Sequence, residues 1–159
     1  MAVKRLGKNA AFVACSGGCR ATADCRYGCV ACGVCVSVCK FEAIEINALG
    51  VAEVHEDRCI GCGRCVKECP RGVIGLHERL NPIVVRCSNH DLGKNARAMC
   101  SVSCIGCGIC EKACPSGAIR VQDHLARLDD SLCLSCGQCL VQCPRGVIGD
   151  VRGILRGKA

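Results

Sequence analysis

Aromatic side chains are almost absent from this sequence of 159 residues, which has two phenylalanines, one tyrosine and no tryptophan. A small domain without large apolar side chains cannot build a conventional core and needs disulfides or metal to fold. The cysteine count is odd, at 21, and no secretion signal is visible, so a disulfide framework is disfavoured. Bound metal is therefore the expected source of stability.

Long apolar runs are missing as well. No stretch of eighteen or more apolar residues occurs, and no direct insertion into a membrane is expected. The apolar run at residues 10–15 is too short for the hydrophobic part of a secretion signal. We therefore expect a cytoplasmic protein, one that partner subunits could still hold at the cytoplasmic face of a membrane.

Recognisable catalytic motifs are also lacking. There is no Gly-rich phosphate loop, no nucleophile motif and no convincing acid–base pair. The histidines have charged neighbours and are expected at the surface; they are His55, His77, His90 and His124. The chain is thus expected to have no catalytic site of its own.

What the sequence has instead is a repeated cysteine motif. The pattern C-x2-C-x2-C-x3-C occurs four times, beginning at Cys29, Cys59, Cys104 and Cys133. The second and fourth copies continue identically as Pro-Arg-Gly-Val-Ile-Gly, at residues 70–75 and 144–149. The larger repeat is therefore a pair of motifs, duplicated in tandem.

This spacing is typical of bacterial ferredoxins, in which three cysteines of one motif bind a [4Fe–4S] cluster and the fourth binds the cluster of the partner motif. Zinc is disfavoured, because tetrahedral zinc uses two separated cysteine pairs. The predicted ligand sets are Cys29, Cys32, Cys35 and Cys69; Cys59, Cys62, Cys65 and Cys39; Cys104, Cys107, Cys110 and Cys143; and Cys133, Cys136, Cys139 and Cys114.

The expected fold is α+β, with two tandem, cluster-nucleated ferredoxin domains. Alternating residues predict hairpins at 43–46 with 51–54 and at 118–121 with 125–128, and short helical turns follow the third cysteines. A strand is expected at 83–87 and a helical turn at 93–99. The predicted divisions are an N-terminal arm (1–24), a first domain (25–80), an ordered connector (81–103), a second domain (104–149) and a basic, solvated tail (150–159).

Five cysteines lie outside the motifs: Cys15, Cys19, Cys25, Cys87 and Cys100. They could be free buried thiols. Alternatively the N-terminal arm folds back over the connector, and Cys15, Cys19, Cys87 and Cys100 complete a fifth cluster site. Cys25 is an alternative to Cys19 there. It also competes with Cys32 in the first motif, and the sequence does not decide between Cys25 and Cys32.

The formal net charge of +7 suggests a nucleic-acid partner only if every cysteine is neutral. Each cluster with its four thiolates carries roughly −2, so four clusters bring the total to about −1 and five to about −3. Aromatic side chains for stacking on bases are missing too. No nucleic-acid partner is expected. A docking face for an acidic redox protein is a separate hypothesis, with Lys67, Arg71, Lys94, Arg97 and Arg145 as its candidates.

The connector makes the sequence resemble one family closely, the B subunit of the Rnf complex, a membrane-bound ferredoxin:NAD oxidoreductase of many anaerobic bacteria. The matching segments are Ala14-Cys-Ser-Gly, Cys25-Arg-Tyr-Gly-Cys29, residues 84–97 (VVRCSNHDLGKNAR) and Cys100-Ser-Val-Ser-Cys-Ile-Gly-Cys. We expect this chain to differ from the family in two ways: it would have no membrane anchor and no further cluster domain ahead of residue 10, and its stretch between Cys19 and Cys25 would be shortened.

The resemblance implies a polyferredoxin that exchanges single electrons with ferredoxin or flavodoxin and relays them into larger oxidoreductase subunits. The alternative is a tightly bound electron-transfer subunit of a soluble molybdenum, tungsten, hydrogenase or flavin oxidoreductase. The two hypotheses differ in partner more than in chemistry.

Overall fold

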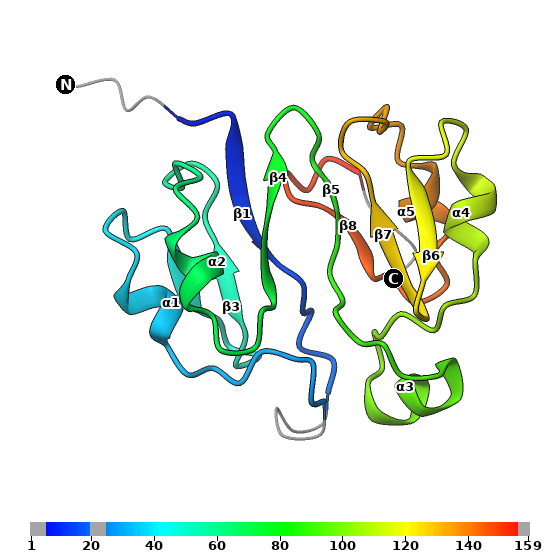
Figure 1. Ribbon diagram of the computed structural model, residues 1–159, viewed down its shortest axis with the longest axis horizontal. Coiled ribbons are helices and arrows are strands. Elements are labelled where there is room, and N and C mark those ends of the chain that lie inside the picture. The colour runs from blue at the N-terminus through cyan, green and yellow to red at the C-terminus, as the bar shows by residue number, and fades with distance from the viewer. Residues whose placement is uncertain (1–5, 20–24, 156–159) are drawn as a thin grey trace.

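A computed structural model defines residues 6–19 and 25–155 of the protein, which form two similar halves lying side by side (Figure 1). The elements of the first half are β1 Asn9–Val13, α1 Val34–Ser37, β2 Ile44–Ile46, β3 Ala52–Val54, α2 Arg64–Glu68 and β4 Ile74–Glu78. Those of the second half are β5 Ile83–Val85, α3 Gly93–Met99, α4 Ile109–Ala113, β6 Ile119–Gln122, β7 Leu125–Leu128, α5 Gln138–Gln142 and β8 Ile148–Asp150.

Each half contains two antiparallel strand pairs. The inner pairs, β2 with β3 and β6 with β7, are the hairpins that alternation in the sequence predicted. The outer pairs join segments far apart in the chain: β1 runs against β4, and β5 runs against β8. The arm before the first motif and the connector before the third thus each supply one strand to the adjoining motif pair.

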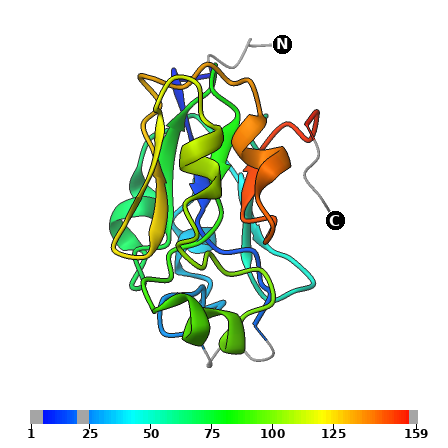
Figure 2. The same ribbon diagram turned by 90° about the vertical axis from the view of Figure 1, so that its right-hand side faces the viewer.

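The short helices carry the third cysteine of each motif. In every motif the helix follows a left-handed glycine with φ of 72° to 75°, at Gly33, Gly63, Gly108 and Gly137. Helices α1 and α2 pack together in the first half, and α4 and α5 in the second. Figure 2 shows α4 and α5 side by side, with α3 at the opposite end of the molecule.

The core is divided into two clusters of small and β-branched side chains together with cysteines. Ile83 and Ile119 are fully buried in the second cluster, and Val73 is nearly so in the first. Cysteines belong to both clusters, so the ligand loops are themselves part of the core. Within the described residues, no helix has the length and apolar character needed to cross a membrane.

Several expectations about single elements change. The helix Gly93–Met99 is confirmed, whereas the strand expected at 83–87 ends at Val85. Strands β1, β4 and β8 were not predicted, because glycines interrupt the alternation in the last two.

The prediction that every histidine lies at the surface is wrong for His77, which is 2% exposed on β4. Its Nδ1 lies 3.0 Å from the carbonyl oxygen of Asn81 and its Nε2 lies 2.9 Å from Glu56 Oε1. The ring therefore links β4 to the loops around residues 56 and 81.

The start of the tail is likewise not simply solvated. Asp150 is buried, and its carboxylate accepts backbone N–H bonds from Arg152, Ile154 and Leu155. Residues 156–159 lie outside the described residues.

Candidate iron–sulfur centres

The four cysteine motifs share one local backbone geometry. In each, the residues on both sides of the second cysteine have positive φ: the preceding ones are Ala31, Gly61, Gly106 and Ser135, and the following ones are the helix-capping glycines. Such a backbone turns successive N–H groups inward and creates a concavity that suits an anionic group. The N–H groups of Gly61 and Ser135 donate to the first sulfur of their motif, Cys59 Sγ and Cys133 Sγ, each at 3.4 Å.

One predicted ligand set in each half lines a pocket of its own. Cys29, Cys32, Cys35 and Cys69 surround a pocket walled by Ile46, Ala52 and Val73. Cys104, Cys107, Cys110 and Cys143 surround a second pocket walled by Val121, Ala126 and Val147. The walls come from corresponding elements of the two repeats, which indicates that the duplication preserved the site. Cys32, and not Cys25, lies in the first pocket.

The predicted sets of the second and fourth motifs are brought together as well. This follows from the effect of neighbouring thiols on the pKa of the third cysteine of each set. Burial, followed by the charges of neighbouring thiols, raises the pKa of Cys65 and of Cys139 to about 11. The neighbours of Cys65 are Cys59, Cys39 and Cys62, and those of Cys139 are Cys133, Cys114 and Cys136. Each set thus includes the fourth cysteine of the partner motif, as the ferredoxin pattern requires.

Burial and neighbouring thiols also act on the third cysteines of the two sets that line pockets, Cys35 and Cys110. Burial and then the charge of Cys29 raise the pKa of Cys35, and burial with the charges of its own set raises that of Cys110 to about 12. At Cys114 burial acts upward, but hydrogen bonds from Ser116 and from backbone N–H groups lower the pKa overall. A thiol with a raised pKa keeps its proton near neutral pH until a metal displaces it.

Exposure follows the motif position. The second cysteine of every motif is exposed, whereas the third is buried. The exposed residues are Cys32, Cys62, Cys107 and Cys136. The buried residues are Cys35, Cys65, Cys110 and Cys139. One edge of each predicted cluster would therefore lie at the surface.

The donor sets fit iron–sulfur clusters better than single metal ions. Four thiols with inward N–H donors provide both the ligands and the hydrogen bonds that such clusters use. In the described part of the chain, no three His, Cys, Asp or Glu side chains converge closely enough to hold one ion, whereas zinc needs four donors within about 2.3 Å. When bound, clusters of this type supply one-electron chemistry.

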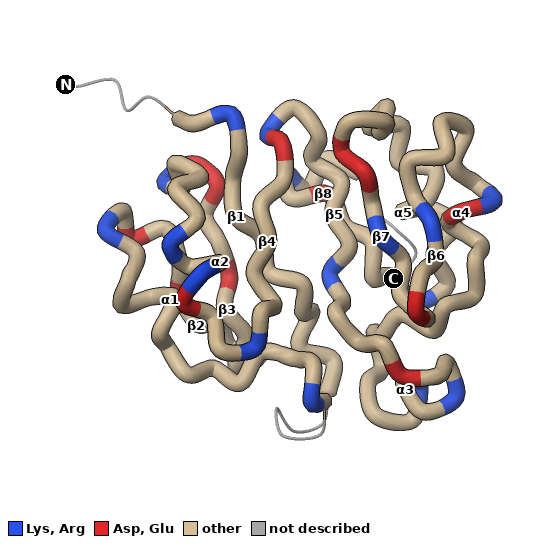
Figure 3. Tube along the Cα trace, viewed as in Figure 1, with Lys and Arg blue, Asp and Glu red and all other residues tan. Residues whose placement is uncertain are grey.

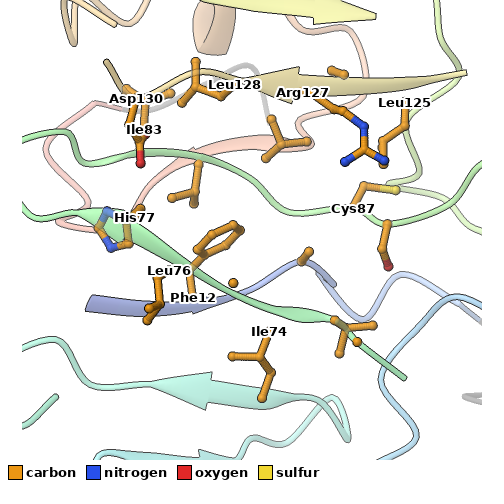
Figure 4. Close-up of a pocket in the computed structure, with 18 of the residues that line it drawn as sticks. Phe12, Ile74, Leu76, His77, Ile83, Cys87, Leu125, Arg127, Leu128 and Asp130 are labelled. Carbon is orange, nitrogen blue, oxygen red and sulfur yellow. The ribbon is translucent and has the colours of Figure 1, made fainter. Parts of the chain in front are cut away.

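The surplus cysteines meet where the two halves adjoin. Cys15, Cys19, Cys25, Cys87 and Cys100 all line one cavity, which we call the seam cavity. Next to it, a larger cavity of about 340 Å³ separates β1 and β4 from β5 and β7. Figure 4 shows Phe12 pointing into this larger cavity, with His77 and Asp130 toward one end and Cys87 at the other.

Basic side chains do not gather on one face of the molecule. Lysine and arginine alternate with acidic residues over both halves in Figure 3. Of the five candidates for a docking face, Arg71 and Arg145 bind backbone carbonyls, those of Arg26 and Cys100, each at 2.7 Å. Lys67, Lys94 and Arg97 are exposed.

Paired cysteine motifs, a hairpin between them and outer strands that close each half define a ferredoxin-type iron–sulfur protein. The chain belongs to the 4Fe-4S dicluster domain family, which matches residues 28–73 and 103–147. A second match to a family of the same description covers residues 58–119. The predicted α+β fold and the presence of several [4Fe–4S] clusters are thereby confirmed. The cluster count and the ligands of each cluster stay predictions.

Curated relatives carry the name expected from the connector. The chain is 42% identical over 105 residues to the B subunit of the Na(+)-translocating ferredoxin:NAD(+) oxidoreductase complex of Acetobacterium woodii, covering 66% of this chain and 32% of that protein. It is 42% identical over 113 residues to the B subunit of the ion-translocating oxidoreductase complex of Methanosarcina acetivorans, covering 71% and 43%. The predicted resemblance to these B subunits is confirmed.

A further relative is the B subunit of the proton-translocating ferredoxin:NAD(+) oxidoreductase complex of Clostridium ljungdahlii, 42% identical over 108 residues, covering 68% of this chain and 38% of that protein. The chain thus spans between about a third and two fifths of the length of these relatives. Among solved structures, a chain of a formate dehydrogenase–heterodisulfide reductase–formylmethanofuran dehydrogenase complex from Methanospirillum hungatei is 23% identical, covering 77% of this chain and 52% of that one. Its TM-score is 0.30.

Proposed function

We propose that this chain relays single electrons between a low-potential donor, a ferredoxin or flavodoxin, and the larger subunits of an oxidoreductase complex of the Rnf type. The observation that carries the proposal is the arrangement of the four motif sets. Each set buries its third cysteine and exposes its second. Such a site shields a cluster from solvent while leaving one edge within reach of a partner protein.

The names of the relatives support this class of partner. All three are B subunits of ion-translocating oxidoreductase complexes, and two of the names include ferredoxin and NAD. We propose by analogy that this chain associates with such a complex at the cytoplasmic side of a membrane, through partner subunits. Lys67, Lys94 and Arg97 are exposed and support docking of an acidic donor.

The test uses the anaerobically prepared holoprotein and a separately reduced ferredoxin freed of excess reductant. Electrons are expected to pass from the ferredoxin to the holoprotein, so that the S = 1/2 EPR signals of the holoprotein grow while those of the ferredoxin decline. The rate is expected to fall with added salt, because screening weakens attraction between opposite charges. Zinc in place of iron and sulfide would contradict the proposal at the outset.

A charge reversal tests the docking surface in the same assay. Lys94→Glu with Arg97→Glu is expected to slow reduction by ferredoxin severalfold and to weaken its dependence on salt. Arg120→Glu, on the exposed side of β6, is the matched control. If ferredoxin does not reduce the wild-type holoprotein, and the chain copurifies in fixed ratio with a molybdenum, tungsten, hydrogenase or flavin subunit, the alternative function is correct.

A further inference from the structure

The seam cavity is built from equivalent positions of the two repeats. Cys15 lies two residues after the end of β1, and Cys87 lies two residues after the end of β5. The residues before them make the same contact: Ala14 N–H donates to the carbonyl oxygen of Val73, and Arg86 N–H to that of Val147, each at 2.7 Å. Cys15 and Cys87 are therefore counterparts in the duplication.

A second pair of counterparts completes the cavity. Cys25 precedes Cys29 by four residues, and Cys100 precedes Cys104 by four residues. Cys29 and Cys104 are the first cysteines of equivalent motifs. Each repeat therefore brings one strand-end cysteine and one upstream cysteine to the seam. Cys19 has no counterpart in the second repeat.

At the seam, as in the motifs, backbone N–H groups lie close to cysteine sulfurs. The N–H of Cys104 donates to Cys87 Sγ at 3.3 Å. In the first repeat, Cys15 Sγ lies beside Gly28, the residue before Cys29, 3.6 Å from where a Cβ of Gly28 would be. Ala11 N–H donates to Cys59 Sγ and Ala43 N–H to Cys39 Sγ in the same way, each at 3.4 Å. Hydrogen bonds of this kind stabilise the negative charge of cluster thiolates.

The loops that carry the upstream cysteines are held in place by equivalent arginines. Arg71 donates to the carbonyl oxygen of Arg26, next to Cys25, and Arg145 donates to that of Cys100 itself. Across the seam, the hydroxyl of Ser88 donates to the carbonyl oxygen of Tyr27 at 2.7 Å. The four cysteines thus lie on segments that the fold fixes, which a preformed metal site requires.

We propose that Cys15, Cys25, Cys87 and Cys100 bind a fifth [4Fe–4S] cluster at the seam, two thiolates from each repeat. This inference rests on the proposed function, because it assumes that the chain carries iron–sulfur clusters. The cluster would adjoin one motif site in each half, since Cys87 Sγ accepts from the N–H of Cys104 and Cys15 Sγ lies beside Gly28, which precedes Cys29. Single electrons could then pass between the repeats with no bond formed or broken.

Cys19 is the surplus thiol in this assignment, where the sequence alone favoured it over Cys25. Cys19 pairs with Cys100 in an isolated antiparallel bridge and, unlike the other four surplus cysteines, has no counterpart in the second repeat. Cys19 therefore lies beside a ligand and does not replace one.

The test is the iron and sulfide content of anaerobically reconstituted protein. The wild type is expected to bind about twenty iron atoms per chain, as five clusters require. Cys19→Ala is expected to bind the same number, whereas Cys25→Ala is expected to lose between one and four, since a cluster held by three thiolates has one iron without a protein thiolate and releases it readily. Iron loss in Cys19→Ala with none in Cys25→Ala would overturn the assignment.

The wild type also separates failure of this inference from failure of the proposed function. About sixteen iron atoms per chain would remove the fifth cluster and leave the four motif clusters intact. Little iron or sulfide at all would refute the electron relay itself.

A second measurement avoids substitutions that could disturb folding. The wild-type holoprotein is treated with iodoacetamide under anaerobic conditions, and the modified cysteines are identified by mass spectrometry. Modification of Cys19 without loss of iron is expected, because it is a partly exposed, unligated thiol. Complete protection of Cys19 in the folded holoprotein would contradict its surplus role.

Discussion

Left-handed residues beside the second cysteine shape every ligand loop. Gly61 and Gly106 occupy the position before that cysteine in two motifs, whereas Ala31 and Ser135 occupy it in the others, each with φ of 53°. A non-glycine residue there costs roughly 1–2 kcal/mol. The backbone conformation is therefore required by the loop, and glycine is indispensable only where a side chain would also meet a neighbour.

Gly61 is such a position, and its replacement gives a residue-scale prediction. A Cβ at Gly61 would lie 2.3 Å from the carbonyl oxygen of Asn9, whereas one at Gly63 would meet only Leu76 Cδ1 at 3.8 Å. Both residues have positive φ, so Gly63→Ala is a matched control for backbone strain. Gly61→Ala is expected to displace β1 and to lower the temperature at which visible cluster absorbance is lost by more than Gly63→Ala does. Equal losses would show that strain alone matters.

Strand pairs that close each half are the elements the alternating pattern did not reveal. On the β1–β4 pair, Phe12 lies opposite Gly75, and its ring covers the glycine while packing edge-on against His77 at 5.9 Å. An aromatic ring across from a glycine compensates for the missing side chain. This contact explains how a strand with an interior glycine stays paired.

Removing that ring gives the prediction at the scale of elements. Phe12→Ala would uncover Gly75 and widen the adjoining cavity of about 340 Å³. Because Phe12 is only partly buried, the expected destabilisation is roughly 2 kcal/mol, below that of a fully buried phenylalanine. Faster loss of cluster absorbance on heating would measure it. Leu80→Ala, at a side chain 83% exposed, is the control and is expected to change little; equal effects would argue against the contact.

Cluster assembly couples the whole molecule to pH. Without clusters, the thiols of Cys65 and Cys139 have a pKa of about 11 and that of Cys110 of about 12, so they are protonated at pH 7. Iron binds the thiolate, and assembly therefore releases protons. The raised pKa stabilises the metal-free fold below pH 9.0 and this contribution is lost as pH rises toward 11, the opposite sign to cluster binding.

The resulting prediction is that clusters bind more tightly as pH rises from 7 to 9. Competition with an iron chelator, followed at fixed ionic strength, is expected to require more chelator at the higher pH. Each proton released would change the apparent affinity about tenfold per pH unit. An affinity independent of pH over this range would contradict the raised thiol pKa values.

Much of the site could be predicted before any fold was known, because cluster ligation depends on local spacing. The four motifs, their pairing through the fourth cysteine and the two hairpins all follow from residues within about forty positions of one another. The surplus cysteines could not be assigned in this way, since a cavity between two repeats depends on how distant segments pack. An offset of four residues before Cys29 and before Cys104 was visible in the sequence and was the signal that could have singled out Cys25.

By itself, then, the sequence determined the chemistry of this protein: a chain poor in aromatic side chains and rich in regularly spaced cysteines builds its metal ligands into its core. Tertiary structure decided the pairing of β1 with β4 and of β5 with β8, the burial of His77 and Asp150, and the meeting of the surplus cysteines. The physical reason is the distance along the chain over which each interaction acts. Ligand loops are shaped by neighbouring φ and ψ angles, whereas the seam exists only where two duplicated halves face each other.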